Sequence, residues 1–243
     1  MTPDRTLGIA ERLVRQIVRD HRSVALIFAA PMVVMALVGF SFADQPAILD
    51  RAAPALLAVF AFFFTFVLTG VSFLRERAQG TLERLQSTPV GRGDILVGYL
   101  LGFLLFAALQ TTVILLFTIL VLKVGYAGEL WEIFLFLMVL VVVSVNLGIF
   151  ISTFARNEFQ VVQFIPLVFA PQVFLSGILL PVEQMPQFLQ AVARVLPLRY
   201  AVEGMREIML QGKGLSGVTS ELAVLAGFAV VLLVLAGVTV RRS

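Results

Sequence analysis

The residues best suited to a specific task lie in one charged segment, residues 73–90, between two long apolar runs. Ala78, Leu82 and Leu85 recur at helical spacing and predict one apolar face of a helix over 75–87. A polar face is formed by Glu76, Gln79, Glu83 and Gln86. Gly80 lowers helix propensity by about 1 kcal/mol. The isolated helix would be only marginally stable, so we predict that the segment binds a surface of another protein. The alternative is a solvated loop with an ordinary cluster of charges.

The end of this segment is also marked in the sequence. Pro89 disfavours helix at Thr88, and Asp94 can cap the apolar run that follows.

A second charged cluster lies near the C-terminal end of the chain. Arg199, Glu203 and Arg206 are spaced by four and three residues, so one helix would bring them together. Glu203 lies where both arginines can neutralise it. We predict that these three residues form an external gate, the alternative being charges at the level of the lipid headgroups.

Several kinds of chemistry are excluded. The chain has no cysteine, one histidine (His21) and two lysines (Lys123 and Lys213). It has no phosphate-binding G-x-x-x-x-G-K-[ST] loop and no hydrolase or metalloprotease motif. We therefore predict no catalytic residue, no metal site and no ATPase activity of its own.

The elements that must position these clusters are membrane helices. Of 243 residues, 60% are hydrophobic and 14% are charged, which is typical of a membrane protein. Six apolar runs are close to or above the ~20 residues that cross a bilayer as a helix. These runs are residues 24–42, 52–74, 95–122, 133–154, 161–180 and 222–240. We predict an all-α membrane protein with a single domain over residues 1–243.

The distribution of positive charge predicts the orientation. Twelve of the 18 lysines and arginines fall in the N-terminal segment, the second and fourth loops and the C-terminal tail. The positive-inside rule then places both termini in the cytoplasm. A signal peptide is the less favoured explanation of the first run.

Two segments outside these spans have amphipathic patterns. Residues 5–22 combine an apolar stripe of Ile9, Leu13 and Ile17 with arginines elsewhere, which predicts an interfacial helix or a basic leader. Residues 183–212 carry two patterns, one with Met185, Phe188, Leu189, Val192 and Leu196. The other contains Leu198, Val202, Met205 and Met209.

This second segment follows a run containing Pro166, Pro171 and Pro181, which are expected to interrupt the fifth span. Residues 183–212 therefore predict a re-entrant external hairpin or a surface helix pair.

Three motifs resemble one known family. Arg75-Glu76-Arg77-Ala78-Gln79-Gly80-Thr81-Leu82-Glu83-Arg84-Leu85, followed by Thr88-Pro89-Val90, resembles the cytoplasmic loop of type 2 ABC transporter permeases. Residues 175–186 and 196–206 resemble that family's fifth-span exit and the segment after it. The resemblance covers nearly the whole chain.

The resemblance implies an N-terminal elbow helix at 5–22 and a coupling helix at 75–87. ATPase-coupling residues would be Arg75, Glu76, Gly80, Leu82, Glu83, Arg84 and Leu85. A substrate path would be lined by Phe62, Phe66, Thr69, Gln172 and Ser176.

The resemblance also implies partners and cofactors. Two ATPase subunits would bind ATP and Mg²⁺, this chain would bind no cofactor, and a second permease copy or a paralogue would complete the complex. The chain would contact lipid and no nucleic acid, in a plasma or bacterial inner membrane.

The expected function is ATP-driven export of an amphipathic or hydrophobic drug, antibiotic, lipid or glycan. An ATP-independent channel or carrier, and a permease that transmits force without a soluble cargo, remain open alternatives.

Overall fold

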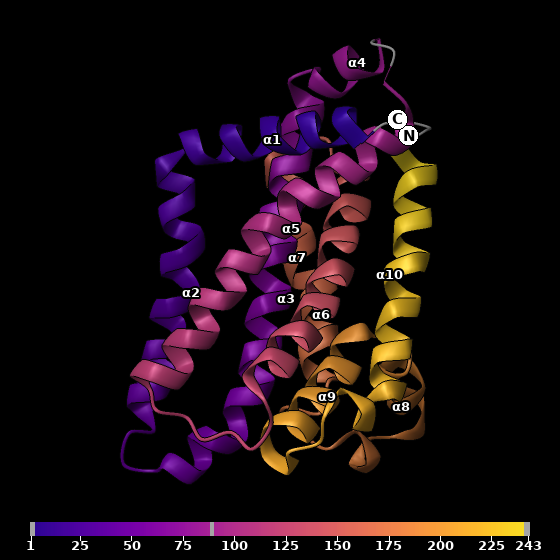
Figure 1. Ribbon diagram of the computed structural model, residues 1–243. Coiled ribbons are helices and arrows are strands. Elements are labelled where there is room, and N and C mark those ends of the chain that lie inside the picture. The colour runs from indigo at the N-terminus through magenta and orange to yellow at the C-terminus, as the bar shows by residue number, and fades with distance from the viewer. Residues whose placement is uncertain (1–2, 88–89, 241–243) are drawn as a thin grey trace.

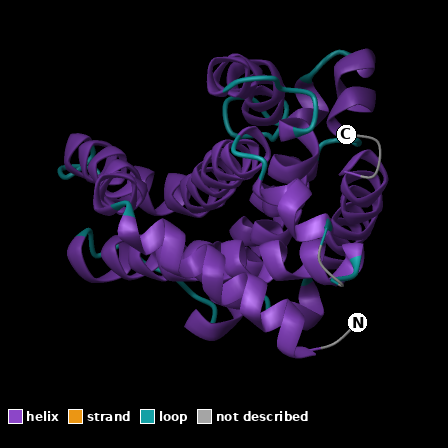
Figure 2. Cartoon of the chain, turned by 90° about the horizontal axis from the view of Figure 1, so that it is seen from above, coloured by secondary structure: helices purple, strands orange, loops and turns teal. Residues whose placement is uncertain are grey.

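The computed structural model describes residues 3–87 and 90–240, and this part of the chain consists of helices and loops without a strand (Figures 1 and 2). The predictions made for Thr88 and Pro89 lie outside the described residues. The longer helices are α1 (Pro3–Arg19), α2 (His21–Ser41), α3 (Pro46–Ala78), α5 (Arg92–Leu116), α6 (Leu130–Ser152), α7 (Glu158–Phe174), α9 (Pro197–Gln211) and α10 (Thr219–Val240). The shorter elements are α4 (Thr81–Gln86), α8 (Gln187–Ala193) and three turns of other helix types, η1 (Phe117–Val121), η2 (Val182–Gln184) and η3 (Leu215–Gly217).

Five helices are long and apolar enough to cross a membrane, which confirms an all-α membrane protein. They cover Val24–Ser41, Pro46–Ala78, Gly93–Val121, Leu130–Ser152 and Thr219–Thr239. The remaining predicted run, the fifth at 161–180, is longer than the helix with which it overlaps. α7 has 17 residues and ends at Phe174, so it is about 26 Å long at 1.5 Å per residue.

The prolines of the fifth run do not interrupt its helix, contrary to the prediction. α7 contains both Pro166 and Pro171, because a proline removes only local hydrogen bonds, which neighbouring protein groups can replace. The helix ends after Phe174 instead, and the chain turns at Gly177, whose φ of 84° favours glycine.

Helix α1 lies across the end of the bundle from which α4 projects (Figure 1). Its apolar stripe of Ile9, Leu13 and Ile17 is buried. A Cβ added to Gly98 of α5 would lie 2.7 Å from Cβ of Ile9, and one added to Gly102 would lie 2.8 Å from Leu13. The stripe predicted to face the membrane surface therefore packs on α5, since these glycines, one helical turn apart, let the two helices approach closely.

The centre of the bundle is held by small residues and neutral polar groups. A Cβ on Gly148 of α6 would lie 2.9 Å from the Thr69 Cβ of α3. The Ser144 hydroxyl donates to the Phe62 carbonyl at 2.5 Å, and Asn146 Nδ2 donates to the Ala229 carbonyl of α10 at 3.0 Å. Neutral polar side chains therefore join membrane helices here, which is common in helical membrane proteins.

The segment after α7 forms helices α8 and α9 at the end opposite α1 and α4 (Figure 1). In α9, the predicted apolar face is buried: Leu198, Val202, Met205 and Met209. Gly212 ends α9 in the left-handed conformation, with φ of 67°, which glycine adopts without steric cost. The pattern predicted around α8 is only partly correct, because Phe188 is 68% exposed and Val192 is 43% exposed.

Candidate functional site

A buried carboxylate, Glu76, joins three helices near the end of the bundle where α4 projects. Glu76 lies in the last turn of α3 and its side chain is 1% exposed. Its Oε2 accepts hydrogen bonds from Arg12 Nη2 of α1 and from the Tyr99 hydroxyl of α5, both at 2.5 Å. Arg12 Nη2 also lies 2.8 Å from the Tyr99 oxygen. The two donors to Oε2 offset part of the cost of removing the carboxylate from water.

Two opposing effects act on the pKa of Arg12. Partial burial disfavours the guanidinium, but Tyr99 and Glu76 outweigh that effect and raise the pKa of Arg12 above its usual value. Arg12 is therefore a permanent cation in this cluster and keeps α1 attached to the last turn of α3.

Arg75, the neighbour of Glu76, joins a different set of elements. Its Nε donates to Glu158 Oε1 at 2.8 Å and its Nη2 to Glu158 Oε2 at 3.2 Å, so the pair is bidentate. Arg75 Nη1 lies 3.7 Å from Asp20 Oδ2. The end of α3 is thus tied to the start of α7 and to the corner between α1 and α2.

The predicted helix over 75–87 is two helices. Arg75 and Glu76 belong to the last turn of α3, which ends at Ala78, and α4 begins at Thr81. Gly80 separates them in the left-handed conformation, with φ of 66°. This conformation is typical of the residue that ends a helix, and it explains why one continuous apolar face does not form.

Helix α4 has six residues, too few for a stable isolated helix. Arg84 Nη2 donates to the Gln79 carbonyl at 2.8 Å, and Arg84 Nε lies 3.4 Å from the Gly80 carbonyl. Leu85 is partly buried against the main core. Leu82 and Glu83 also lie on α4, but their side chains are outside the described part of the structure.

The predicted path residues are buried inside the chain. The exposed fractions are at most 3% for Phe62, Phe66, Thr69, Gln172 and Ser176. Phe62 stacks on Phe169 with ring centroids 6.1 Å apart, and Gln172 Oε1 accepts a hydrogen bond from the Leu198 amide at 3.2 Å. These contacts give Phe62 and Gln172 packing roles in this conformation. For all five residues, a role in lining a path stays a prediction.

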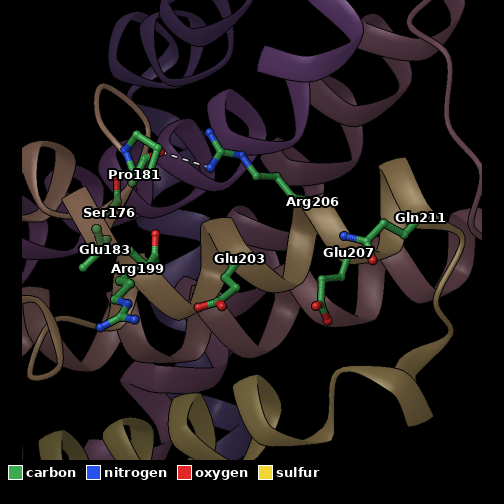
Figure 3. Close-up of a pocket in the computed structure, with 10 residues that line it drawn as sticks. Ser176, Pro181, Glu183, Arg199, Glu203, Arg206, Glu207 and Gln211 are labelled. Atoms are coloured by element: carbon green, nitrogen blue, oxygen red, sulfur yellow. Dashed lines mark hydrogen bonds between the residues drawn. The ribbon is translucent and has the colours of Figure 1, made fainter.

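The predicted gate residues do line one cavity. A hollow of 250 Å³ between α9 and the turn after α7 is lined by Arg199, Glu203 and Arg206 together with Ser176 (Figure 3). Among the described residues, Glu203 forms no ion pair with either arginine. Both arginines nevertheless interact with it electrostatically. Arg206 Nη1 donates to the Gly177 carbonyl at 3.0 Å, which fixes the turn after α7.

Partial burial in this cavity shifts the pKa values of Glu203 and Arg206. Partial desolvation raises the pKa of Glu203 above its usual value, Arg199 opposes the rise, and neighbouring acids such as Glu221 add to it. Desolvation lowers the pKa of Arg206, and Glu203 opposes that effect.

Comparison with known proteins identifies the family. Residues 6–210 match the family described as "ABC-2 type transporter". The chain belongs to the ABC-2 type transporter family. The sequence resemblance to type 2 ABC transporter permeases is therefore confirmed, and the chain is a multi-pass membrane protein of that family.

Relatives of this ABC-2 type chain carry several names. It is 30% identical over 147 residues to "Probable multidrug ABC transporter permease YbhS" of Escherichia coli, covering 60% of this chain and 39% of the relative. It is 34% identical over 167 residues to "ABC transporter G family member 20" of Dictyostelium discoideum, covering 69% and 23%. "Linearmycin resistance permease protein LnrN" of Bacillus subtilis is 28% identical over 160 residues, covering 66% and 41%. The matched part is less than half of each of these relatives.

Sequence reasoning missed four members of the charged clusters. Arg12 and Asp20 were assigned only to an amphipathic helix, and Tyr99 and Glu158 were not singled out. Tyr99 did carry a signal, because it is a hydroxyl-bearing residue inside an otherwise apolar run. Its partner Glu76 lies 23 positions away, and no local pattern connects them.

Proposed function

We propose that this chain is the membrane-spanning subunit of an ATP-driven exporter. Two separately encoded ATPase subunits would bind ATP and Mg²⁺ and contact α4, while this chain would bind no cofactor. The observation that carries the proposal is α4 itself, a short helix that projects from the bundle and is anchored to α3 through Gly80 and Arg84 (Figure 1). Motion of α4 would then reach α3 and, through Glu76, helices α1 and α5.

The proposed topology has six crossings, with both termini, α1 and α4 in the cytoplasm. α7 would form the fifth crossing together with residues 175–180. The concentration of arginine at that end of the molecule supports this orientation. The hairpin of α8 and α9 would then close the external exit, with Arg199, Glu203 and Arg206 at the gate.

A second permease copy, or a paralogue, would complete the cargo path between protomers. Large apolar side chains remain exposed on α2 and α7, including Leu37 at 64% and Leu167 at 69%. Such faces suit contact with a partner helix or with lipid, in a plasma or bacterial inner membrane.

The proposed cargo is an amphipathic or hydrophobic molecule of the drug, antibiotic, lipid or glycan type. The names of the relatives YbhS and LnrN, which mention multidrug transport and linearmycin resistance, support the drug and antibiotic part of that range. The phenylalanine-rich second span is compatible with such cargo.

Affinity purification of the full chain from its own membranes tests the proposal. We expect an ABC ATPase subunit to co-purify, and the complex in proteoliposomes to move cargo only with hydrolysable ATP. Transport by the chain alone, unchanged by ATP, would instead establish an ATP-independent channel or carrier.

A further inference from the structure

A second cavity, of 470 Å³, lies where α1, α2 and α3 meet. α2 forms one wall with Leu26 and Ile27, α3 forms another, and α1 crosses one end. This volume is within the range of small-molecule binding sites.

The lining of this cavity changes from apolar to polar along α3. Phe64, Val67 and Val71 lie on one face of the helix and are followed by Arg75 and Gln79. From residue 64 to residue 79 the helix rises about 22 Å. The α1 side adds Gln16 and Asp20 at the polar end. The cavity therefore offers an apolar slot beneath a polar head site, a shape that suits an amphiphile.

The polar end contains an unsatisfied acceptor. Glu76 lines the cavity, and its Oε2 already accepts hydrogen bonds from Arg12 and Tyr99. Its other oxygen, Oε1, is buried and has no hydrogen-bond partner. A buried carboxylate oxygen without a donor is unfavourable. A ligand that supplies a donor there would remove that cost.

The charges around the head site favour a cation over an anion. The cluster contains Asp20, Glu76 and Glu158 against Arg12 and Arg75, and both arginines are already bound to these acids. These five described residues have a formal charge of minus one in total. An anionic head would meet repulsion, and among the described residues no unused arginine lines the cavity.

We propose that this cavity binds an amphiphile whose apolar tail lies along Phe64, Val67 and Val71 and whose head is a primary ammonium group that donates to Glu76 Oε1. The inference rests on the proposed function in one respect, namely that an amphiphile of this kind belongs to the proposed class of cargo. The same chemistry could be supplied by a soluble amphiphilic amine or by the ammonium head of phosphatidylethanolamine.

The absence of native cysteine makes a direct binding test possible. Ser72 lines the cavity, so the Ser72→Cys variant of the full chain is placed in phosphatidylcholine nanodiscs and reacted with neutral N-ethylmaleimide. The probes are dodecylammonium, dodecanol and dodecyl sulfate. Ser220→Cys, exposed at the opposite end of the molecule, is the control for effects on the reagent or bilayer.

Dodecylammonium is expected to slow labelling at Ser72→Cys about tenfold, in line with a charge-assisted hydrogen bond. Dodecanol should protect less, dodecyl sulfate least, and Ser220→Cys should be unaffected by all three. Adding Glu76→Gln, or Asp20→Asn if that variant does not fold, should reduce protection by ammonium. Equal protection by sulfate and ammonium, or protection unchanged in the folded variants, would overturn the proposal.

A second arm distinguishes the two sources of the ligand. Nanodiscs containing phosphatidylethanolamine should slow labelling without added amine if a membrane lipid fills the site. Unchanged labelling, together with protection by dodecylammonium, would assign the site to a soluble amine. No ATPase or nucleotide is present, so failure of binding and failure of ATP-driven transport are separate results.

Discussion

At the scale of residues, Glu76 depends on the two donors that surround its Oε2. Arg12 comes from α1 and Tyr99 from α5, so the carboxylate links three helices that lie far apart in the sequence. Arg12 is 36% exposed, and its share of this stabilisation is therefore reduced by solvent. The buried Tyr99 hydroxyl is the member of the cluster whose removal should be most informative.

Replacing Tyr99 with phenylalanine should lower the free energy of unfolding by about 1–2 kcal/mol, because a buried carboxylate loses a donor while the ring is kept. Titration with sodium dodecyl sulfate in mixed micelles measures this change. Tyr126→Phe is the matched control, since Tyr126 is 40% exposed in a loop and its loss should have no effect. Equal stability of the two variants would contradict the role given to Tyr99.

At the scale of elements, Gly80 determines where α3 ends and α4 begins. Alanine at this position should cost about 1–2 kcal/mol, because L-residues disfavour the left-handed conformation. We expect faster proteolysis within residues 79–87 of Gly80→Ala. Gly227→Ala is the control, since Gly227 lies within α10 with no atom near an added Cβ. Unchanged cleavage in Gly80→Ala would show that the turn does not fix α4.

The close packing of α1 against α5 depends on Gly98. Gly98→Ala should destabilise the chain by about 1–3 kcal/mol, because the new methyl group overlaps Ile9. The change is measurable as a lower midpoint of thermal unfolding. Gly8→Ala on α1 has nothing within 4 Å of an added Cβ and should leave the midpoint unchanged or raise it. A midpoint of Gly98→Ala equal to that of the unsubstituted chain would mean that α1 is not held there.

The elements that could be predicted from the sequence are those marked by a long apolar run or by a regular helical spacing of apolar residues. Five apolar runs coincide with long apolar helices, and the buried face of α9 follows its helical spacing. The end of α7 was misplaced, because an apolar run does not show where a helix stops. The Glu76 cluster was missed, because Arg12 and Glu76 are 64 positions apart and only the packing of α1 on α5 brings them together.

At the scale of the whole molecule, the described end of α10 lies at the same end of the bundle as α1 and α4 (Figure 1). The proposed orientation places that end in the cytoplasm and α8 outside. Ala191 is exposed on α8, and Ala191→Cys should react with a membrane-impermeant maleimide in intact cells. Phe159→Cys, at the exposed start of α7, should react only after permeabilisation. The reverse pattern would invert the topology and remove the external gate.

The central claim is that α4 transmits the work of an ATPase to the membrane helices, and the coupling ratio of the purified complex tests it most directly. The double variant Leu82→Asp/Glu83→Arg changes α4, and Thr219→Asp/Ser220→Arg makes the same kind of change at the opposite end. Cargo moved per ATP hydrolysed is measured in proteoliposomes that contain the co-purified ATPase. We expect the α4 variant to insert normally but to lose most transport per ATP, while the control keeps it. Normal transport per ATP in the α4 variant would contradict the account.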